Sequence, residues 1–267
     1  TDEEFLRIFR IMHDLYKLKT LHFTGGEPLM RKTLPEIIKQ CRIISGKDLD
    51  IAMTTNAALL ESKLEELVNA GLSRANISFH SIDDKKYQQF TGSKTKVEDI
   101  KRIIHKSKEA GLGIKINSVV IRGFNDMDIP KMANFCFNEG VIPRFLELGI
   151  YGPVAQWYTE KDQVPHKEIL KIMEDNFGKF ERDMTYRGNG PSKYYKNEKG
   201  QIFGILDNQS DKLCRGCDRF RMSANGYIKV CNFNPIDLRP YLKSDEELKE
   251  QLLILGDYLH SRGNDYI

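Results

Sequence analysis

The sequence predicts an α/β protein whose N-terminal part is a parallel sheet covered by helices. Short apolar, β-branched runs alternate with amphipathic helical segments along the first 151 residues. The runs begin about every 30 residues, which is the length of one strand–helix–strand unit. Gly71, Gly111 and Gly140 stand where helices should end. These observations favour a parallel sheet with right-handed crossovers, either open or closed toward a barrel.

The expected elements follow from this alternation. An opening helix carries apolar side chains at helical spacing from Phe5 to Tyr16. Strands are expected at residues 20–24, 50–55, 75–79, 113–121 and 143–149, with helices at 34–45, 60–70, 96–110 and 129–138. Beyond residue 151 we expect a connector over 152–165, a helix near 166–176, short strands and turns over 184–231, and a final helix near 244–260. The sequence thus predicts one domain over residues 1–151 and a second region over 152–267.

Composition limits the function. The 267 residues include 41 basic and 38 acidic side chains, a balance that argues against bulk binding to nucleic acid. The longest stretch without a charge runs from Leu148 to Thr159, and a membrane span needs about 20 consecutive apolar residues. Five cysteines without a secretory signal indicate a reducing cytoplasm rather than a disulfide framework. Cys41 and Cys136 lie in partly apolar helical segments, so we expect both to be small buried thiols.

Polar residues mark the ends of the predicted strands. The strands finish in sequences such as Thr24-Gly25-Gly26-Glu27-Pro28 and Thr54-Thr55-Asn56, whereas strands covered on both faces read as continuous apolar runs. Lys115 and Asn117 lie two apart, so both should point to one face of their strand. We therefore expect a site on the face where the carboxyl ends of the strands meet, with Lys115 pointing inward toward an anionic substrate.

Three cysteines form the sharpest local motif. Cys214, Cys217 and Cys231 follow the spacing Cys-x2-Cys-x13-Cys. Three thiolates suit a [4Fe–4S] cluster with one open iron, and a structural zinc with a fourth ligand of another type is equally compatible. On a strand, Arg219 and Arg221 would share a face with Cys217, and paired guanidinium groups suit phosphate or carboxylate.

The turn after these arginines permits two registers. A two-residue Asn225-Gly226 loop would place Cys231 opposite Phe220, whereas a three-residue loop over 224–226 would place it opposite Arg219. Directly opposed residues project from the same face, so a substrate site shared by cluster and arginines needs the second register. We predict the three-residue loop, with Gly226 at positive φ.

Several ordered motifs resemble those of one known family. Gly25-Gly26-Glu27-Pro28 resembles the motif with which radical S-adenosylmethionine (SAM) enzymes bind the amino group of SAM. The longer runs resemble the GTP 3′,8-cyclase family, which acts first in molybdenum-cofactor biosynthesis, over nearly the whole chain. They comprise residues 23–32, Thr54-Thr55-Asn56, Asn76-Ile77-Ser78, residues 115–120, residues 188–195, the cysteine motif with Arg219 and Arg221, and Asp237-Leu238-Arg239-Pro240.

The resemblance implies a fold and a reaction. The fold is a partial (β/α)6 TIM-like radical SAM barrel over residues 1–151, followed by a C-terminal α+β auxiliary-cluster region over 152–267. The family uses two [4Fe–4S] clusters: one cleaves SAM to a 5′-deoxyadenosyl radical, which takes hydrogen from the ribose C3′ of GTP, and the other holds the guanine. The first cluster's Cys-x3-Cys-x2-Cys loop and the first barrel strand are expected upstream of Thr1.

The resemblance also assigns residues and partners. Cys214, Cys217 and Cys231 would hold the auxiliary cluster. The SAM-binding residues would be Gly25, Gly26, Glu27, Ser78 and Gly149, and the GTP-binding residues Thr54, Lys115, Arg219, Arg221 and His22. The implied partners are GTP or a similar nucleotide, an electron-donor protein and a downstream cofactor-biosynthesis enzyme. A homodimer is compatible with the resemblance, and neither membrane nor nucleic acid is expected.

Departures from the family pattern keep alternatives open. His22 stands where the family usually has arginine, His80 replaces an acidic residue, Asp218 replaces asparagine and Gly149 replaces methionine. One alternative is a related radical SAM enzyme for another nucleotide or a peptide. The other is a non-catalytic, zinc-stabilised binding module. Metal analysis would distinguish these classes, because a radical SAM enzyme would contain iron and sulfide and the binding module would contain zinc.

Overall fold

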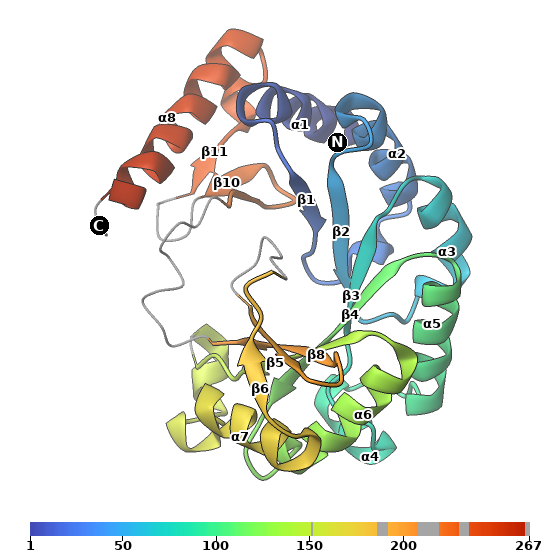
Figure 1. Cartoon of the computed structure of the whole chain (residues 1–267). Helices are drawn as coiled ribbons and strands as arrows, with labels where there is room; N and C mark the ends of the chain where they lie inside the picture. The colour runs from blue at the N-terminus through green and yellow to red at the C-terminus, as the bar shows by residue number, and fades with distance from the viewer. Residues whose placement is uncertain (151, 186–191, 208–218, 230–234, 265–267) are drawn as a thin grey trace. The chain divides into compact units, whose positions relative to one another are not determined.

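The computed structural model describes residues 1–150, 152–185, 192–207, 219–229 and 235–264, with side chains of the last helix described as far as Asp257 (Figure 1). Its first part contains α1 (Asp2–Tyr16), β1 (Thr20–Phe23), α2 (Leu34–Ser45), β2 (Asp50–Thr55), α3 (Leu60–Asn69), β3 (Arg74–Ser78), α4 (Asp84–Thr91), α5 (Val97–Glu109), β4 (Gly113–Val120), α6 (Ile129–Glu139) and β5 (Ile142–Glu147). It continues with α7 (His166–Phe177), β6 (Phe180–Arg182), β7 (Lys193–Asn197), β8 (Ile202–Leu206), β9 (Arg221–Met222), β10 (Tyr227–Lys229), β11 (Ile236–Asp237) and α8 (Asp245–Asn264).

The main sheet has eight strands in the order β1-β2-β3-β4-β5-β8-β7-β6. The pairs from β2 to β5 are parallel, and β8 is parallel to β5. From β8 the chain returns through the antiparallel strands β7 and β6. The predicted parallel α/β fold is therefore confirmed, and three strands from beyond residue 151 extend the same sheet.

The chain divides into two compact units that are discontinuous in sequence. The sheet unit comprises His22–Lys32 and Asp50–Ser210, and the C-terminal unit comprises Thr1–Leu21, Thr33–Leu49 and Asp211–Ile267. This grouping does not follow the division expected at residue 151, because β8 hydrogen-bonds to β5 and ties the following region to the sheet.

Within the sheet unit, alternation separates an apolar face from a polar one. Ile77 and Ile116 are fully buried, while Asn76 and Lys115 on the same strands project to the opposite side. Helices α5, α6 and α7 pack against β4, β5 and β8. The helices thus cover the apolar side, and the polar side carries the candidate site.

The C-terminal unit has a core of its own. Ile8 and Met12 of α1 pack with Ile228 of β10 and with Leu248 and Leu252 of α8. The small sheet β11-β10-β9 lies in this unit. The predicted terminal helices therefore serve one shared core.

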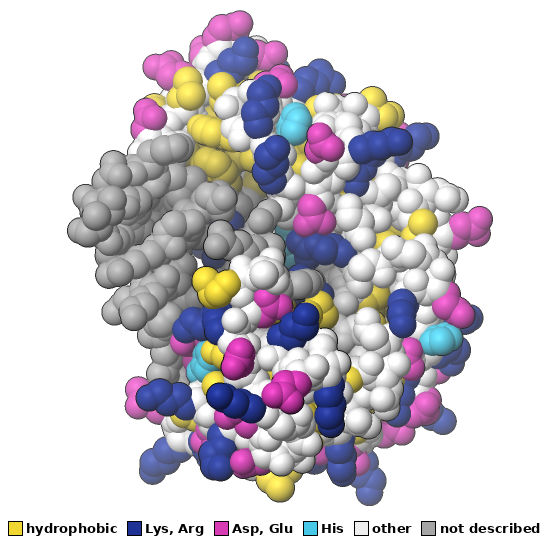
Figure 2. Space-filling view, in the orientation of Figure 1, with side chains coloured by type: hydrophobic (Ala, Val, Ile, Leu, Met, Phe, Trp, Pro, Cys, Tyr) yellow, Lys and Arg dark blue, Asp and Glu magenta, His cyan; other side chains and the backbone are white. Residues whose placement is uncertain are grey.

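Charges are interspersed over the face of the molecule shown in Figure 2, in keeping with the near-balanced composition. The two remaining cysteines of the described chain, Cys41 and Cys136, are fully buried thiols, as predicted. Burial raises the pKa of Cys41 to about 12. No helix in the described ranges is both long enough and apolar enough to cross a membrane.

Candidate active site

A row of polar side chains crosses the sheet. Thr54, Asn76 and Lys115 are direct partners across β2, β3 and β4. One step further along, Asn117 pairs with Arg144 of β5. Directly opposed residues project to the same face, so these side chains share one surface, here called the polar face.

Lys115 is buried on the polar face. Only 8% of the residue is exposed, and its Nζ donates to the hydroxyl of Tyr194 over 3.2 Å. Burying an ammonium group is costly unless polar groups surround it. The predicted inward orientation of Lys115 is thus confirmed, and its contact with a substrate stays a prediction.

His22 and Thr54 contact each other. The His22 Nε2 lies 2.8 Å from the Thr54 Oγ1, and the amide nitrogen of Asn76 lies 3.4 Å from both atoms. Among the described residues, the buried Oδ1 atoms of Asn76 and Asn117 have no hydrogen-bond partner. Such acceptors are rare in protein interiors, and they suit a ligand that brings hydroxyl or N–H donors.

The loop after β1 holds a carboxylate in a fixed position. The Glu27 Oε1 accepts from the Thr55 hydroxyl at 2.7 Å and from the Leu29 amide at 3.1 Å, and Oε2 accepts from the Asn56 amide at 2.8 Å. A carboxylate has about four acceptor positions, so it can still receive an ammonium donor. A Cβ atom built at Gly25 or Gly26 would meet no other atom within 4 Å, so there is open space on that side of the backbone. The remaining acceptor positions of this carboxylate fit the amino group expected of SAM.

Ser78 lies at the end of β3 beside a cavity. The cavity has a volume of about 260 Å³, and its lining includes Asn56, Ser78, His80 and Phe90. Ser78 pairs with Asn117, so it also belongs to the polar face. Gly149 follows β5 and is half-buried. All five predicted SAM residues therefore lie at the carboxyl ends of strands: four in the loops that follow β1 and β5, and Ser78 as the last residue of β3.

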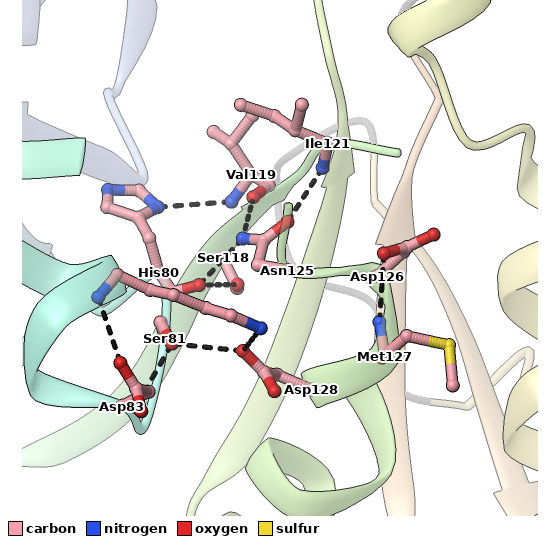
Figure 3. A network of polar contacts seen from close by, with 11 residues as sticks. His80, Ser81, Asp83, Ser118, Val119, Ile121, Asn125, Asp126, Met127 and Asp128 are labelled. Atoms are coloured by element: carbon pink, nitrogen blue, oxygen red, sulfur yellow. Dashed lines mark hydrogen bonds and ion pairs between the residues drawn. The ribbon is translucent and has the colours of Figure 1, made fainter. Parts of the chain in front are cut away.

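A hydrogen-bond network fixes the loops behind Ser78 (Figure 3). The Asn125 amide donates to the carbonyls of His80, at 2.7 Å, and Val119, at 2.8 Å, while its oxygen accepts from the Ile121 amide. The His80 Nδ1 accepts from the Val119 N–H at 3.2 Å, so a neutral ring carries its hydrogen on Nε2. Burial lowers the pKa of His80 to about 4.

An ion pair anchors the same loop to α6. The Asp128 carboxylate accepts from Ser81 at 3.0 Å and from the Lys86 ammonium at 2.9 Å, within the network of Figure 3. The His80 ring also packs against Phe90, with centroids 4.2 Å apart and the ring planes tilted by 35°. The carboxyl ends of β3 and β4 are thereby held together by side chains.

The hairpin that carries Arg219 and Arg221 lies in the C-terminal unit. Arg221 pairs with Lys229 and Met222 with Ile228, and the Gly226 amide donates to the Ser223 carbonyl. This is the three-residue loop over 224–226, and Gly226 has a φ of 84°. The predicted register is therefore confirmed. Cys214, Cys217 and Cys231, and hence the pairing of Cys231 with Arg219, lie outside the described residues.

The sequence did not identify three residues of the polar face. Asn76 and Tyr194 stand within longer motifs that resemble the family, and no sequence pattern distinguishes Arg144. The one available signal was the position of Arg144 on a predicted strand, but its face depends on the register with β4.

Two family models match the chain. Residues 1–136 match the Radical SAM superfamily, and residues 142–264 match Molybdenum Cofactor Synthesis C. GTP 3′,8-cyclase of Aquifex aeolicus is 36% identical over 250 residues, which cover 93% of this chain and 76% of the relative. GTP 3′,8-cyclase of Staphylococcus haemolyticus is 32% identical over 272 residues, which cover 99% of this chain and 79% of the relative.

Solved structures share the fold. SuiB of Streptococcus suis has a TM-score of 0.64 at 14% identity, over 92% of this chain and 58% of SuiB. Coproporphyrinogen III oxidase of Escherichia coli, a radical SAM enzyme, has a TM-score of 0.50 at 12% identity, over 76% of this chain and 55% of the oxidase. With the fold, both family models and relatives above 30% identity in agreement, the chain belongs to the GTP 3′,8-cyclase family of radical SAM enzymes.

Proposed function

We propose that this protein cyclises GTP by radical SAM chemistry in molybdenum-cofactor synthesis, and that the polar face binds the nucleotide. The observation that carries the proposal is the buried Lys115 ammonium on the same face as Arg144. A buried ammonium group and a half-buried guanidinium group on one face suit the phosphates of a nucleotide. Relatives named GTP 3′,8-cyclase support the identity of the substrate.

Thr54 and His22 are proposed to contact GTP beside Lys115. Their side chains are joined by the 2.8 Å contact, so a ligand at one reaches the other. Arg219 and Arg221 are likewise proposed to contact GTP, as the resemblance to the family implies. The buried oxygens of Asn76 and Asn117 offer acceptors to hydroxyl or amine groups of the nucleotide.

Gly25, Gly26, Glu27, Ser78 and Gly149 are proposed to bind SAM. Three donors orient the Glu27 carboxylate, and an orientation fixed in advance reduces the entropy lost on binding. When bound, the family's [4Fe–4S] cluster and SAM supply a carbon radical that removes hydrogen from the substrate. The residues of this chain orient SAM and the nucleotide relative to each other.

Cys214, Cys217 and Cys231 are proposed to hold the auxiliary [4Fe–4S] cluster. Their spacing and the match of residues 142–264 to Molybdenum Cofactor Synthesis C support this assignment. We further propose a cytoplasmic enzyme that receives electrons from a donor protein and passes its product to a downstream cofactor-biosynthesis enzyme. A homodimer is the assembly that we propose to test by light scattering.

Replacing Lys115 with alanine tests the nucleotide site. Losing a buried hydrogen bond to a charged group costs about 1.5–3 kcal/mol, so the GTP dissociation constant should rise about 10- to 100-fold. Anaerobic calorimetric titration would measure it. Lys199→Ala is the matched control, because Lys199 is exposed at the β7–β8 turn. Equal affinities of the two variants would contradict the proposed site.

A further inference from the structure

Tyr194 connects two cations of the polar face, the buried Lys115 and the half-buried Arg144. It lies on β7 and is 3% exposed, and it pairs with Gly204 of β8, which in turn pairs with Arg144 of β5. The next residue, Tyr195, projects to the other side of the strand, where its hydroxyl lies 2.7 Å from the His166 Nε2. Adjacent tyrosines thus have separate surroundings.

Both cations interact with the Tyr194 hydroxyl. The Lys115 Nζ lies 3.2 Å from the phenol oxygen and 5.2 Å from the ring centroid. Burial alone would raise the pKa of Tyr194, but the positive charges of Arg144 and Lys115, and hydrogen bonds from both, lower it below its ordinary value. The phenol oxygen is therefore a common acceptor for two cations from different strands.

Gly204 makes the space for this arrangement. A Cβ atom built there would lie 3.0 Å from the Tyr194 Cε1 and 3.1 Å from the Arg144 Cγ. Any larger residue at position 204 would press on both side chains at once. The absence of a side chain at Gly204 lets the tyrosine ring and the arginine stem lie side by side on the polar face.

We infer that Tyr194 is a positioning residue for the substrate phosphates, because its hydroxyl holds the Lys115 ammonium and the Arg144 guanidinium at one point. The two like charges repel each other, and both side chains are long and flexible. A shared acceptor offsets part of the repulsion and restricts both side chains before the anion arrives. The inference rests on the proposed function, since the anion it concerns is the phosphate group of GTP.

Tyr194→Phe in the cluster-containing protein tests the inference, with Tyr195→Phe as the matched control. The phenylalanine keeps the ring and removes only the shared oxygen. We expect the dissociation constant for GTP to rise about tenfold, and that for guanosine, which has no phosphate, to change less than twofold. In turnover, the KM for GTP should rise about tenfold with kcat within twofold, because the bond that breaks is on the ribose.

A second variant controls for a general loss of folding. Gly204→Ala keeps the Tyr194 hydroxyl but displaces either this hydroxyl or Arg144. It should therefore weaken the binding of GTP without weakening the binding of guanosine. The inference is wrong if Tyr194→Phe binds GTP as tightly as Tyr195→Phe does. It is also wrong if Tyr194→Phe loses affinity for GTP and for guanosine by the same factor. If instead Lys115→Ala leaves GTP affinity unchanged, the proposed nucleotide site fails and the inference fails with it.

Discussion

His80 should make the stability of the protein depend on acid pH. Its ring accepts a hydrogen bond from the Val119 N–H and packs against Phe90, and burial lowers its pKa from 6.5 to about 4. The unfolded chain takes up the proton first as pH falls through this range. The free energy of unfolding therefore decreases between pH 6.5 and about 4, and it is unaffected by this group well above 6.5.

The size of the effect follows from the gap between the two pKa values. A shift from 6.5 to about 4 corresponds to on the order of 3 kcal/mol below both values, and roughly 2.5 kcal/mol is already lost at pH 4.5. The reference is His80→Asn, whose amide oxygen can take the position of Nδ1 and accept from Val119 without titrating. Losing the ring contact with Phe90 should lower the stability of this variant by a similar amount at every pH.

Urea unfolding of both proteins between about pH 7.5 and 4.5 measures the difference. Acid damage to iron–sulfur clusters affects both proteins, so subtracting the two curves isolates the histidine. We expect the wild type to lose about 2.5 kcal/mol more than His80→Asn over this range. Parallel curves would refute the reasoning, because the buried imidazole would then not resist protonation.

Two further variants test the C-terminal region. Gly226→Val places a β-branched residue at a φ of 84° with its Cβ about 3.0 Å from the Arg239 Cγ, and it should cost about 1–3 kcal/mol of stability and lower the iron content. Ala224→Val, in the same loop, is the control for thermal unfolding and iron analysis, and equal losses in both variants would count against the loop geometry. Replacing Cys214, Cys217 or Cys231 singly with serine should remove the auxiliary iron, and full iron content in all three variants would disprove their assignment.

The sequence predicted regular, apolar elements well. The helix over 34–45 and the strand over 50–55 lie as expected, because the apolar spacing and the flanking residues of each segment indicate the same element. Helix α4 was not predicted: it is a polar segment in which only Tyr87 is buried, so it lacks the periodicity of a helix that covers a core.

The sequence did not predict which strands pair when they lie far apart along the chain. Neighbours such as β5 and β8 are separated by more than fifty residues, and no local pattern states which strands meet. The polar face shows the consequence. The orientation of Lys115 followed from its own strand, whereas its contact with Tyr194 depends on β7 and β8 adding to the sheet. The turn at Gly226 was predictable, since its register depends only on adjacent residues.

The most direct test of the central claim is transfer of a labelled hydrogen. The protein, expressed from its complete reading frame and loaded with its clusters, would be incubated anaerobically with SAM, a reductant and GTP deuterated at the ribose C3′. We predict that the 5′-deoxyadenosine formed carries deuterium, that a cyclised nucleotide appears with it, and that Lys115→Ala lowers both yields. Formation of unlabelled 5′-deoxyadenosine, independent of GTP, would contradict the account.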